Sequence, residues 1–265
     1  MRSNESKEEL LAGGNISNVY RISNTVRRDL KPNSTNVHKL LLHLEQSGYA
    51  HSPTFKGMDE QGREILSFIE GEAGHYPLKK FMWSDAVLRE VATLQREYHD
   101  AVSNFPFGEW EPMKGTPSPF EVICHNDFAF YNLIFRNEKV VGIIDFDVAA
   151  PGPRQWDIAY TLYTCVPLSR QWHDETGALV PYDAERDGNR IKQRIKRFLT
   201  SYGMQEMKQG IFEMVILRIE SLCAYIEKKA NEGDVAFQNM IDEGHLIHYK
   251  EDLMFIRTQY QDWMD

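Results

Sequence analysis

The fold of this chain is decided by two short stretches near its middle, HNDFAFYN at residues 125–132 and VVGIIDFD at residues 140–147. Apolar runs alternate here with polar turn residues, a pattern that predicts a short strand, a turn and then a hairpin. The hairpin places Asn132 at the start of one strand and Asp145 at the end of its partner. We therefore expect the two side chains to converge on one point, where a metal ion would bind.

The side chains at this point have the chemistry that phosphoryl transfer from a nucleotide requires. Mg²⁺ prefers oxygen ligands, and kinase-like sites supply one carboxylate and one amide oxygen beside phosphate and water. Asp145 and Asn132 fit these two roles. Asp127 has no metal to bind in this scheme, so its ionised carboxylate would accept a hydrogen bond from the acceptor hydroxyl and take its proton.

Three motifs together resemble a known family. The pattern HxDxxxxN at 125–132, IIDFD at 143–147 and PGPRQWDIA at 151–159 is similar to the C-terminal lobe of the aminoglycoside phosphotransferase family. This family is a branch of the protein-kinase-like fold that also includes choline kinases and other small-molecule kinases. The resemblance runs from the Gly13-Gly14 turn to about Leu162 and is strongest between residues 120 and 160.

The resemblance implies an α+β, two-lobed fold of the protein-kinase-like type. Residues 1–70 would form the N-terminal nucleotide-binding lobe, a small antiparallel sheet with one helix, with the hinge at about 66–71. Residues 71–265 would form the larger, mainly helical lobe for catalysis and substrate binding. At 265 residues, of which 42% are hydrophobic, the chain is long enough to bury a core in each.

Further roles within the C-terminal lobe also follow from the resemblance. His125 would pack and hydrogen-bond to brace the catalytic loop, and Asp157, on a later helix, would hold the backbone amides of that loop. Both are supporting residues rather than catalytic ones. Asp147 could contact a second metal ion, but a solvent-facing or loop-capping role is equally open.

Residues 10–22 predict a strand, a glycine-rich turn and a second strand. Adjacent glycines let backbone amides approach a phosphate closely, and neighbouring polar side chains add further hydrogen-bonding groups. An ordinary hairpin turn would show the same pattern. We favour phosphate binding because of where the turn lies in the lobe, and we assign it to Gly13, Gly14, Asn15 and Ser17.

The kinase pattern expects a lysine on the next strand, to neutralise the nucleotide phosphates. This chain has Arg27 and Arg28 there instead. Side chains alternate along a strand, so only one of the two arginines can face the nucleotide. We predict Arg27, with Arg28 as the alternative, because the small Thr25 shares a face with Arg27 where an adenine needs room.

The apolar period and the glycine at the end predict a helix over residues 36–48. In the kinase pattern this helix opens with a glutamate that pairs with the strand cation, but Val37 or His38 occupies that place. The expected ion pair is therefore in doubt. Residues 64–71 resemble the strand and hinge between the lobes, where by analogy the Ser67 carbonyl and the Ile69 amide would bind the adenine.

Composition narrows the partners and the compartment. The formal net charge of −9 makes nucleic acid an unexpected partner. The N-terminus is polar, and no apolar run is long enough to span a membrane. The three cysteines are odd in number and widely separated, which favours reduced thiols. We expect a cytoplasmic protein with no membrane contact, and the sequence leaves its oligomeric state open.

The expected activity is an ATP- or GTP-dependent, Mg²⁺-requiring O-phosphotransferase acting on a small hydroxylated molecule, such as an aminoglycoside-like compound, an amino alcohol or a sugar. A catalytically weak or inactive nucleotide-binding protein with an immunity or regulatory role is the alternative, motivated by the altered strand cation and the missing helix glutamate. An acidic acceptor wall would suit a cationic acceptor, and the candidates for it are Asp174, Glu175, Asp183 and Glu185.

Overall fold

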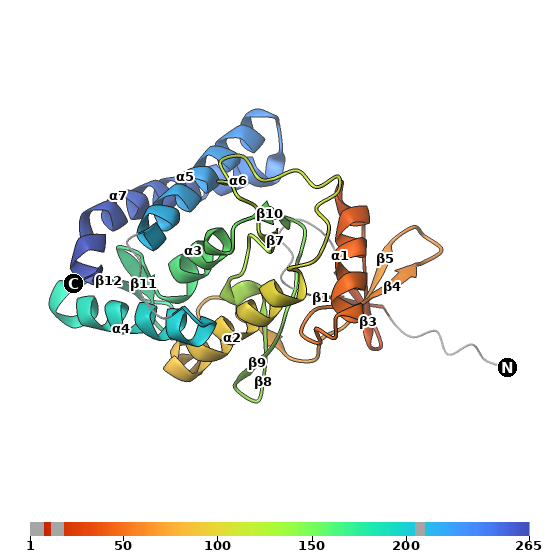
Figure 1. The fold of residues 1–265 in the computed structure, drawn as a ribbon, viewed down its shortest axis with the longest axis horizontal. Coiled ribbons are helices and arrows are strands. Elements are labelled where there is room, and N and C mark those ends of the chain that lie inside the picture. Colours follow the sequence, from red (N-terminus) through yellow and green to blue (C-terminus); the bar gives the residue numbers. More distant parts are fainter. Residues whose placement is uncertain (1–7, 12–18, 205–209, 265) are drawn as a thin grey trace.

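The N-terminal part of the molecule is a small antiparallel sheet with one helix. The computed structural model describes residues 8–11, 19–204 and 210–264. The sheet has the order β1-β2-β3-β5-β4. Its strands are β1 (Glu9–Leu11), β2 (Val19–Ile22), β3 (Thr25–Arg28), β4 (Phe55–Met58) and β5 (Glu64–Ser67). Helix α1 (Ser34–Gln46) lies between β3 and β4 in the chain and buries the apolar stripe Val37, Leu40, Leu41 and Leu44 (Figure 1).

The remainder is mainly helical and contains three small sheets, ordered β6-β8-β9, β10-β7 and β11-β12. Their strands are β6 (Glu72–Ala73), β7 (Val122–Cys124), β8 (Leu133–Arg136), β9 (Lys139–Ile143), β10 (Ala150–Gly152), β11 (Gln171–His173) and β12 (Leu179–Pro181). The helices are η1 (Lys80–Trp83), α2 (Asp85–Ala101), η2 (Phe130–Asn132), α3 (Arg154–Cys165), α4 (Ala184–Tyr202), α5 (Gly210–Asn231), α6 (Val235–Asp242) and α7 (His245–Met264). This is the two-part α+β arrangement that the sequence predicts.

Helix α2 packs against strands β7 and β9, and its sequence explains its position. Ser84 caps its first turn by accepting a hydrogen bond from the Val87 amide at 3.2 Å. The helix then buries a continuous stripe, Val87, Leu88, Val91, Leu94 and Tyr98. The Tyr98 hydroxyl donates to the Ile123 carbonyl at 2.8 Å, which ties α2 to strand β7 directly before the catalytic loop.

Besides the connecting chain, a backbone hydrogen bond and close packing join the two lobes. The segment between α1 and β4 lies against β9, where the Ile143 amide donates to the His51 carbonyl at 2.8 Å. A side chain at Gly142 would bring its Cβ to 2.9 Å from both the His51 carbonyl oxygen and the Ile69 side chain. Glycine is therefore needed at 142 for the close approach of the lobes.

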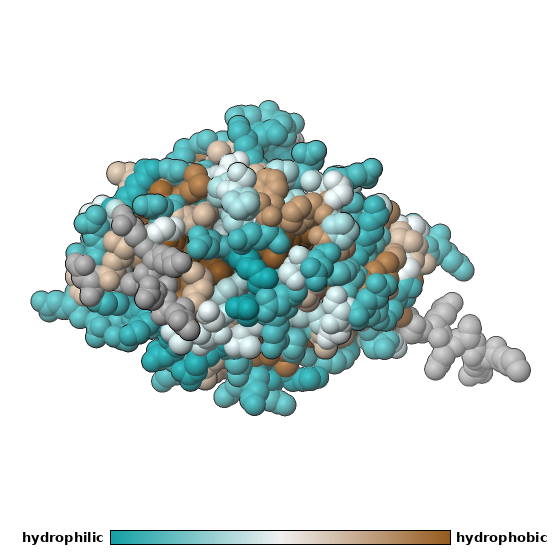
Figure 2. Space-filling view, in the orientation of Figure 1, coloured by the Kyte–Doolittle hydropathy of each residue, from teal (hydrophilic) through white to brown (hydrophobic). Residues whose placement is uncertain are grey.

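The surface is mostly polar on the face shown in Figure 2. Hydrophilic residues, in teal, cover most of it, and hydrophobic residues, in brown, form scattered patches. Within the described ranges, none of the helices combines the length and the apolar character that crossing a bilayer requires.

Candidate active site

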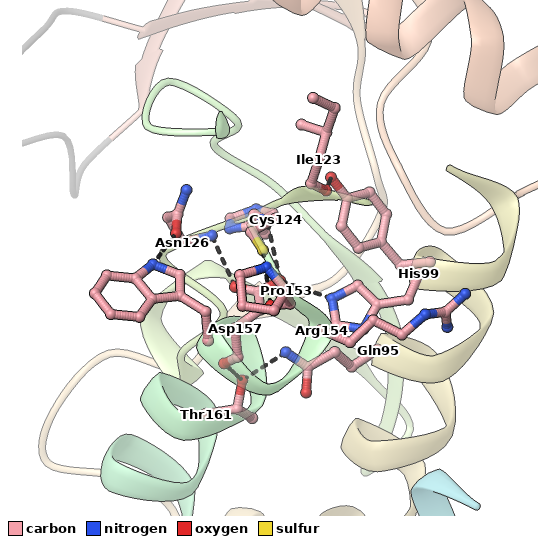
Figure 3. A network of polar contacts seen from close by, with 12 residues as sticks. Gln95, His99, Ile123, Cys124, Asn126, Pro153, Arg154, Asp157 and Thr161 are labelled. Atoms are coloured by element: carbon pink, nitrogen blue, oxygen red, sulfur yellow. Dashed lines mark hydrogen bonds and ion pairs between the residues drawn. The ribbon is translucent and has the colours of Figure 1, made fainter. Parts of the chain in front are cut away.

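Asp157, on α3, organises the loop that follows β7 (Figure 3). Its carboxylate accepts hydrogen bonds from the backbone amides of His125 at 2.9 Å and Asn126 at 2.8 Å. His99 Nε2, from α2, lies 3.0 Å from the same group. Burial alone would raise the pKa of Asp157, but the hydrogen bonds and charge attraction from His99 and His125 outweigh it and lower the pKa. The ionised carboxylate therefore joins two helices to the catalytic loop.

Asn126 is a structural residue that the sequence reasoning did not single out. Its backbone is left-handed, with φ of 65°, a conformation that asparagine tolerates better than most residues. Its side chain donates to the Val148 carbonyl at 3.0 Å and accepts from Trp156 Nε1 at 3.0 Å. Arg218 of α5 donates to its carbonyl at 2.6 Å. An asparagine within a predicted tight turn was the only signal in the sequence.

His125 connects the loop to the strand that leads to Asp145. Its Nε2 lies 3.1 Å from the Ile144 carbonyl oxygen, and its Nδ1 accepts from the Asp127 amide at 3.3 Å. The ring packs on Phe146 with centroids 4.6 Å apart. Burial lowers the pKa of His125, against the attraction of Asp157 and Asp127. These contacts fit an uncharged imidazole ring that holds the loop in place.

Both carboxylate oxygens of Asp127 accept hydrogen bonds from nearby side chains. The Tyr131 hydroxyl donates to Oδ1, and Asn132 Nδ2 donates to Oδ2 at 2.8 Å. The Tyr131 hydroxyl also lies 2.9 Å from the hydroxyl of Tyr160 on α3. Burial raises the pKa of Asp127, although both hydrogen bonds act in the opposite direction. The Tyr131 phenol thus occupies a position that an acceptor hydroxyl would take on a general base.

Asn132 and Asp145 both lie at the open end of the β8–β9 hairpin, one on each side. The Ile144 amide donates to the Asn132 carbonyl at 2.9 Å, beyond the register pair Leu133 and Ile143. The Asn132 amide nitrogen is turned to the Asp127 backbone carbonyl at 3.0 Å as well as to its carboxylate, so its amide oxygen points away from Asp127. Asp145 has a left-handed backbone, with φ of 68°, and a side chain 46% exposed.

These two oxygen donors fit a magnesium ion bound together with phosphate. Among the residues that the structure describes, no cluster of three or more His, Cys, Asp or Glu side chains could hold a metal. A site of one carboxylate and one amide oxygen leaves most positions to phosphate and water, which suits Mg²⁺ in kinase-type sites.

Of the two arginines of β3, the structure places Arg28, the alternative of the sequence analysis, beside the acidic residues that follow β9. Arg27 donates to Thr25 Oγ1 at 2.8 Å and lies 3.8 Å from Asp59, on the face away from the acidic loop. Arg28 instead donates to Asp147 Oδ1 at 2.6 Å and lies 3.6 Å from Asp145. The two arginines point to opposite faces of the sheet, as strand alternation predicts. Thr25 shares its face with Arg27, and its hydroxyl is bonded to that arginine, whereas Arg28 lies on the face of Asp145 and Asp147.

The remaining predicted nucleotide-binding groups have mixed outcomes. Gly13, Gly14, Asn15 and Ser17 lie outside the described residues. The Ser67 side chain accepts from the Thr54 amide at 2.8 Å at the end of β5, and Ile69 packs against β9 at Gly142. The adenine-binding roles of Ser67 and Ile69 stay predictions.

Two of the acidic residues considered for the acceptor wall, Asp174 and Asp183, stabilise local structure. Asp174 accepts from the amides of Thr176 at 2.8 Å and Ala178 at 3.0 Å in the turn between β11 and β12. Asp183 caps α4 through the Arg186 amide at 2.8 Å. The side chain that contacts Asp127 beside Asn132 is a phenol instead, that of Tyr131, and it is followed by the phenol of Tyr160; the charge of Asp127 also acts on Tyr249 of α7. Burial, then the charge of Asp127, raises the pKa of Tyr249 to about 12.

Comparisons with known proteins place the chain in a family. The model of the phosphotransferase enzyme family matches residues 35–186, more than half of the chain. A trifolitoxin immunity protein from Rhizobium leguminosarum bv. trifolii is 32% identical over 216 residues, which cover 77% of this chain and 77% of that protein. The chain therefore belongs to the phosphotransferase enzyme family.

Solved structures confirm the fold. The GDP complex of wild-type aminoglycoside 2'-phosphotransferase-IIIa matches with a TM-score of 0.61 at 15% identity, over 94% of this chain and 92% of that one. A choline/ethanolamine kinase family protein from Mesorhizobium loti matches with a TM-score of 0.58 at 15% identity, over 97% of this chain and 94% of that one. The predicted protein-kinase-like fold, and the resemblance to these two groups, are thus confirmed.

Proposed function

We propose that this protein transfers the γ-phosphoryl group of ATP or GTP to a hydroxyl group of a small molecule. The observation that carries the proposal is the arrangement around Asp127. Its carboxylate accepts from the Asn132 side chain, and the Asn132 carbonyl accepts from the amide of Ile144, directly before Asp145. The proposed base, in the loop after β7, and the proposed metal ligands, at the open end of the β8–β9 hairpin, are thereby held in one small region, as phosphoryl transfer requires.

Each residue has a defined task in this reaction. Asp127 accepts the hydrogen bond of the acceptor hydroxyl, orients it and takes its proton as the new P–O bond forms and the bond between the γ-phosphorus and the bridging oxygen breaks, which releases the nucleoside diphosphate. Asn132 and Asp145 would hold Mg²⁺, which supplies neutralisation of the phosphate charge. Arg28 would donate to the phosphates from β3. We retain Gly13, Gly14, Asn15 and Ser17 as the phosphate-binding turn, and Ser67 and Ile69 as the adenine contacts.

The setting of the reaction is part of the proposal. We place the nucleotide-binding lobe at residues 1–70 and the catalytic lobe at 71–265, with the nucleotide between them. The three free cysteines are all buried, which agrees with a reducing compartment such as the cytoplasm. The phenols near Asp127 favour a neutral hydroxylated acceptor at least as well as a cationic one.

Transfer from ATP and GTP across a panel of hydroxyl compounds tests the proposal. Asp127→Ala and Asp145→Ala should each lower the rate about 10²- to 10⁴-fold. Asp242→Ala, which removes an exposed acid of α6 bonded to Gln238, is the control and should leave the rate nearly unchanged. Equal rates for the wild type and the first two variants would refute the assigned roles.

The alternative is a nucleotide-binding protein that confers immunity without phosphoryl transfer. The observation that favours it is the immunity protein to which this chain is 32% identical. Both candidates predict thermal stabilisation by nucleotide with Mg²⁺, so that measurement does not separate them. Turnover with any acceptor, trifolitoxin included, decides for the transferase. Stabilisation without turnover across the panel decides for the immunity role.

A further inference from the structure

We propose that Glu64 of β5, rather than an acid on α1, is the residue that positions the cation of the nucleotide site, Arg28. The inference rests on the proposed role of Arg28 at the nucleotide phosphates. It accounts for the glutamate that α1 lacks, because the acid is supplied from a neighbouring strand of the same sheet.

Glu64 is fully buried, with 0% of its surface exposed. One of its carboxylate oxygens, Oε1, accepts from Arg28 Nε, and the other, Oε2, lies 2.5 Å from His38 Nε2. A buried carboxylate is strongly unfavourable unless it is paired and hydrogen-bonded. Both of its oxygens are engaged by these two residues, one from β3 and one from α1.

Sheet register holds the pair together. Arg28 and Glu64 are direct partners in the antiparallel pairing of β3 with β5. Cross-strand partners on one face lie close enough for their side chains to interact. The ion pair is therefore set by the sheet itself, and a shift of α1 would remove only the contact from His38.

His38 is held in place independently of Glu64. Its ring stacks on Phe55 of β4, with centroids 3.8 Å apart and an interplanar angle of 14°. His38 is one of the two α1 residues at the place where the kinase pattern has a glutamate. Here it is the second partner of Glu64, an acid on the sheet.

The arrangement also explains why an arginine stands on β3. The guanidinium reaches Glu64 through Nε and Asp147 through Nη2, at 2.6 Å in the second case. It lies 3.6 Å from Asp145 through Nη1. A planar fork can serve acids on two sides at once, which the single ammonium group of lysine cannot do. Arg28 thereby joins the N-terminal sheet to the loop that carries a proposed metal ligand.

Variants that remove the Glu64 carboxylate, or replace it by one on α1, test the role of Glu64. Glu64→Gln keeps the shape of the side chain but removes the charge that orients Arg28. It should weaken the binding of Mg-ATP about 10- to 100-fold, a range typical for partners of ligand-binding groups. The double variant His38→Glu/Glu64→Gln returns an acid to α1 and should recover a large part of that loss. Glu45→Gln, which removes an acid paired with Lys56 on the surface of the same lobe, is the control.

Calorimetric titration with Mg-ATP gives the dissociation constants without any need for turnover. Wild-type affinity in Glu64→Gln, or a double variant no better than the single one, would overturn the proposal. Should Glu64→Gln not fold, the double variant carries the test alone, because nucleotide binding by it requires an acid on α1 to replace Glu64. Wild-type protein that binds Mg-ATP but transfers no phosphate would sink the proposed function and leave this test intact.

Discussion

At the scale of single residues, the most consequential contact is the one between Tyr131 and Asp127. The phenol donates to the carboxylate oxygen that an acceptor hydroxyl would use, and Tyr160 holds it there from α3 at 2.9 Å. An acceptor must either displace this phenol or share the oxygen with it. Tyr131 therefore influences both the size of the acceptor site and the proton affinity of the base.

A pH profile measures the second effect. Asp127 must be ionised to act as a base, so kcat/KM falls as pH drops through its pKa. Burial raises that pKa, while the Tyr131 hydrogen bond lowers it. Tyr131→Phe removes the lowering contribution, so the acidic limb should move to higher pH. Tyr160→Phe, which removes a hydroxyl that contacts Tyr131 and not the Asp127 carboxylate, should move the limb less. A limb that stays in place or moves to lower pH would contradict the assignment of Asp127 as the base.

The sequence could indicate which residues lie close together where the candidate site is local, but not where a contact depends on strand pairing. Asp127, Asn132 and Asp145 lie within 19 positions, in the loop before the β8–β9 hairpin and at the open end of that hairpin, so their proximity follows from the strand pattern. Arg28 and Glu64 are separated by 36 positions, and their contact depends on the register of β3 with β5. The amino-acid sequence does not reveal that register, so it does not predict Glu64 as the partner of Arg28.

At the scale of elements, the close crossing of β6 and the catalytic turn η2 sets the position of Tyr131 and Asn132. The Gly74 amide donates to the Phe130 carbonyl at 3.2 Å and to the Leu133 carbonyl at 3.3 Å. A Cβ atom at Gly74 would lie 2.5 Å from the Phe130 carbonyl oxygen, a contact that no side chain can accept without movement of backbone. The crossing was not foreseen, since two residues of strand give too short a pattern.

Gly74→Ala should therefore cost about 1–3 kcal/mol of unfolding free energy, the usual range for overpacking. It should also reduce activity, because the displaced turn carries Tyr131 and Asn132. Gly188→Ala is the matched control: it lies inside helix α4, where its Cβ would be 3.5 Å from the Tyr182 hydroxyl. That change should stabilise the protein by about 0.5–1 kcal/mol. Denaturant unfolding of both variants gives the comparison, and a neutral Gly74→Ala would show that the turn yields easily.

At the scale of the whole molecule, Asp157 joins parts that lie far apart in the sequence. It stands on α3 and binds the loop after β7 and His99 of α2, which in turn lies 2.7 Å from the Tyr202 hydroxyl at the end of α4. Helices α2 and α3 and the loop after β7 thus meet at one buried carboxylate, and α4 is joined to it through His99. The predicted role of Asp157 covered its hold on the loop amides, but not the helices, because packing between distant helices has no short sequence signature.

Stability should therefore depend on pH through Asp157. A carboxyl group whose pKa is lowered by folding stabilises the protein fully above its ordinary pKa of about 3.9, and this contribution is lost as pH falls through the lowered value. Asp157→Asn presents an amide NH₂ to groups that donate hydrogen bonds and should cost about 3 kcal/mol near pH 7.

Urea unfolding of the wild type and Asp157→Asn, from pH 7 down to the lowest pH at which both fold, measures this dependence. The difference between them should stay constant near neutrality and shrink in acid as the wild-type carboxylate is protonated. Asp100→Asn is the control, since Asp100 pairs with Arg96 and Arg154 at the surface and is 49% exposed. Solvent screening limits its loss to less than about 1 kcal/mol. A loss as small for Asp157→Asn would mean that the loop and helices hold together without this carboxylate.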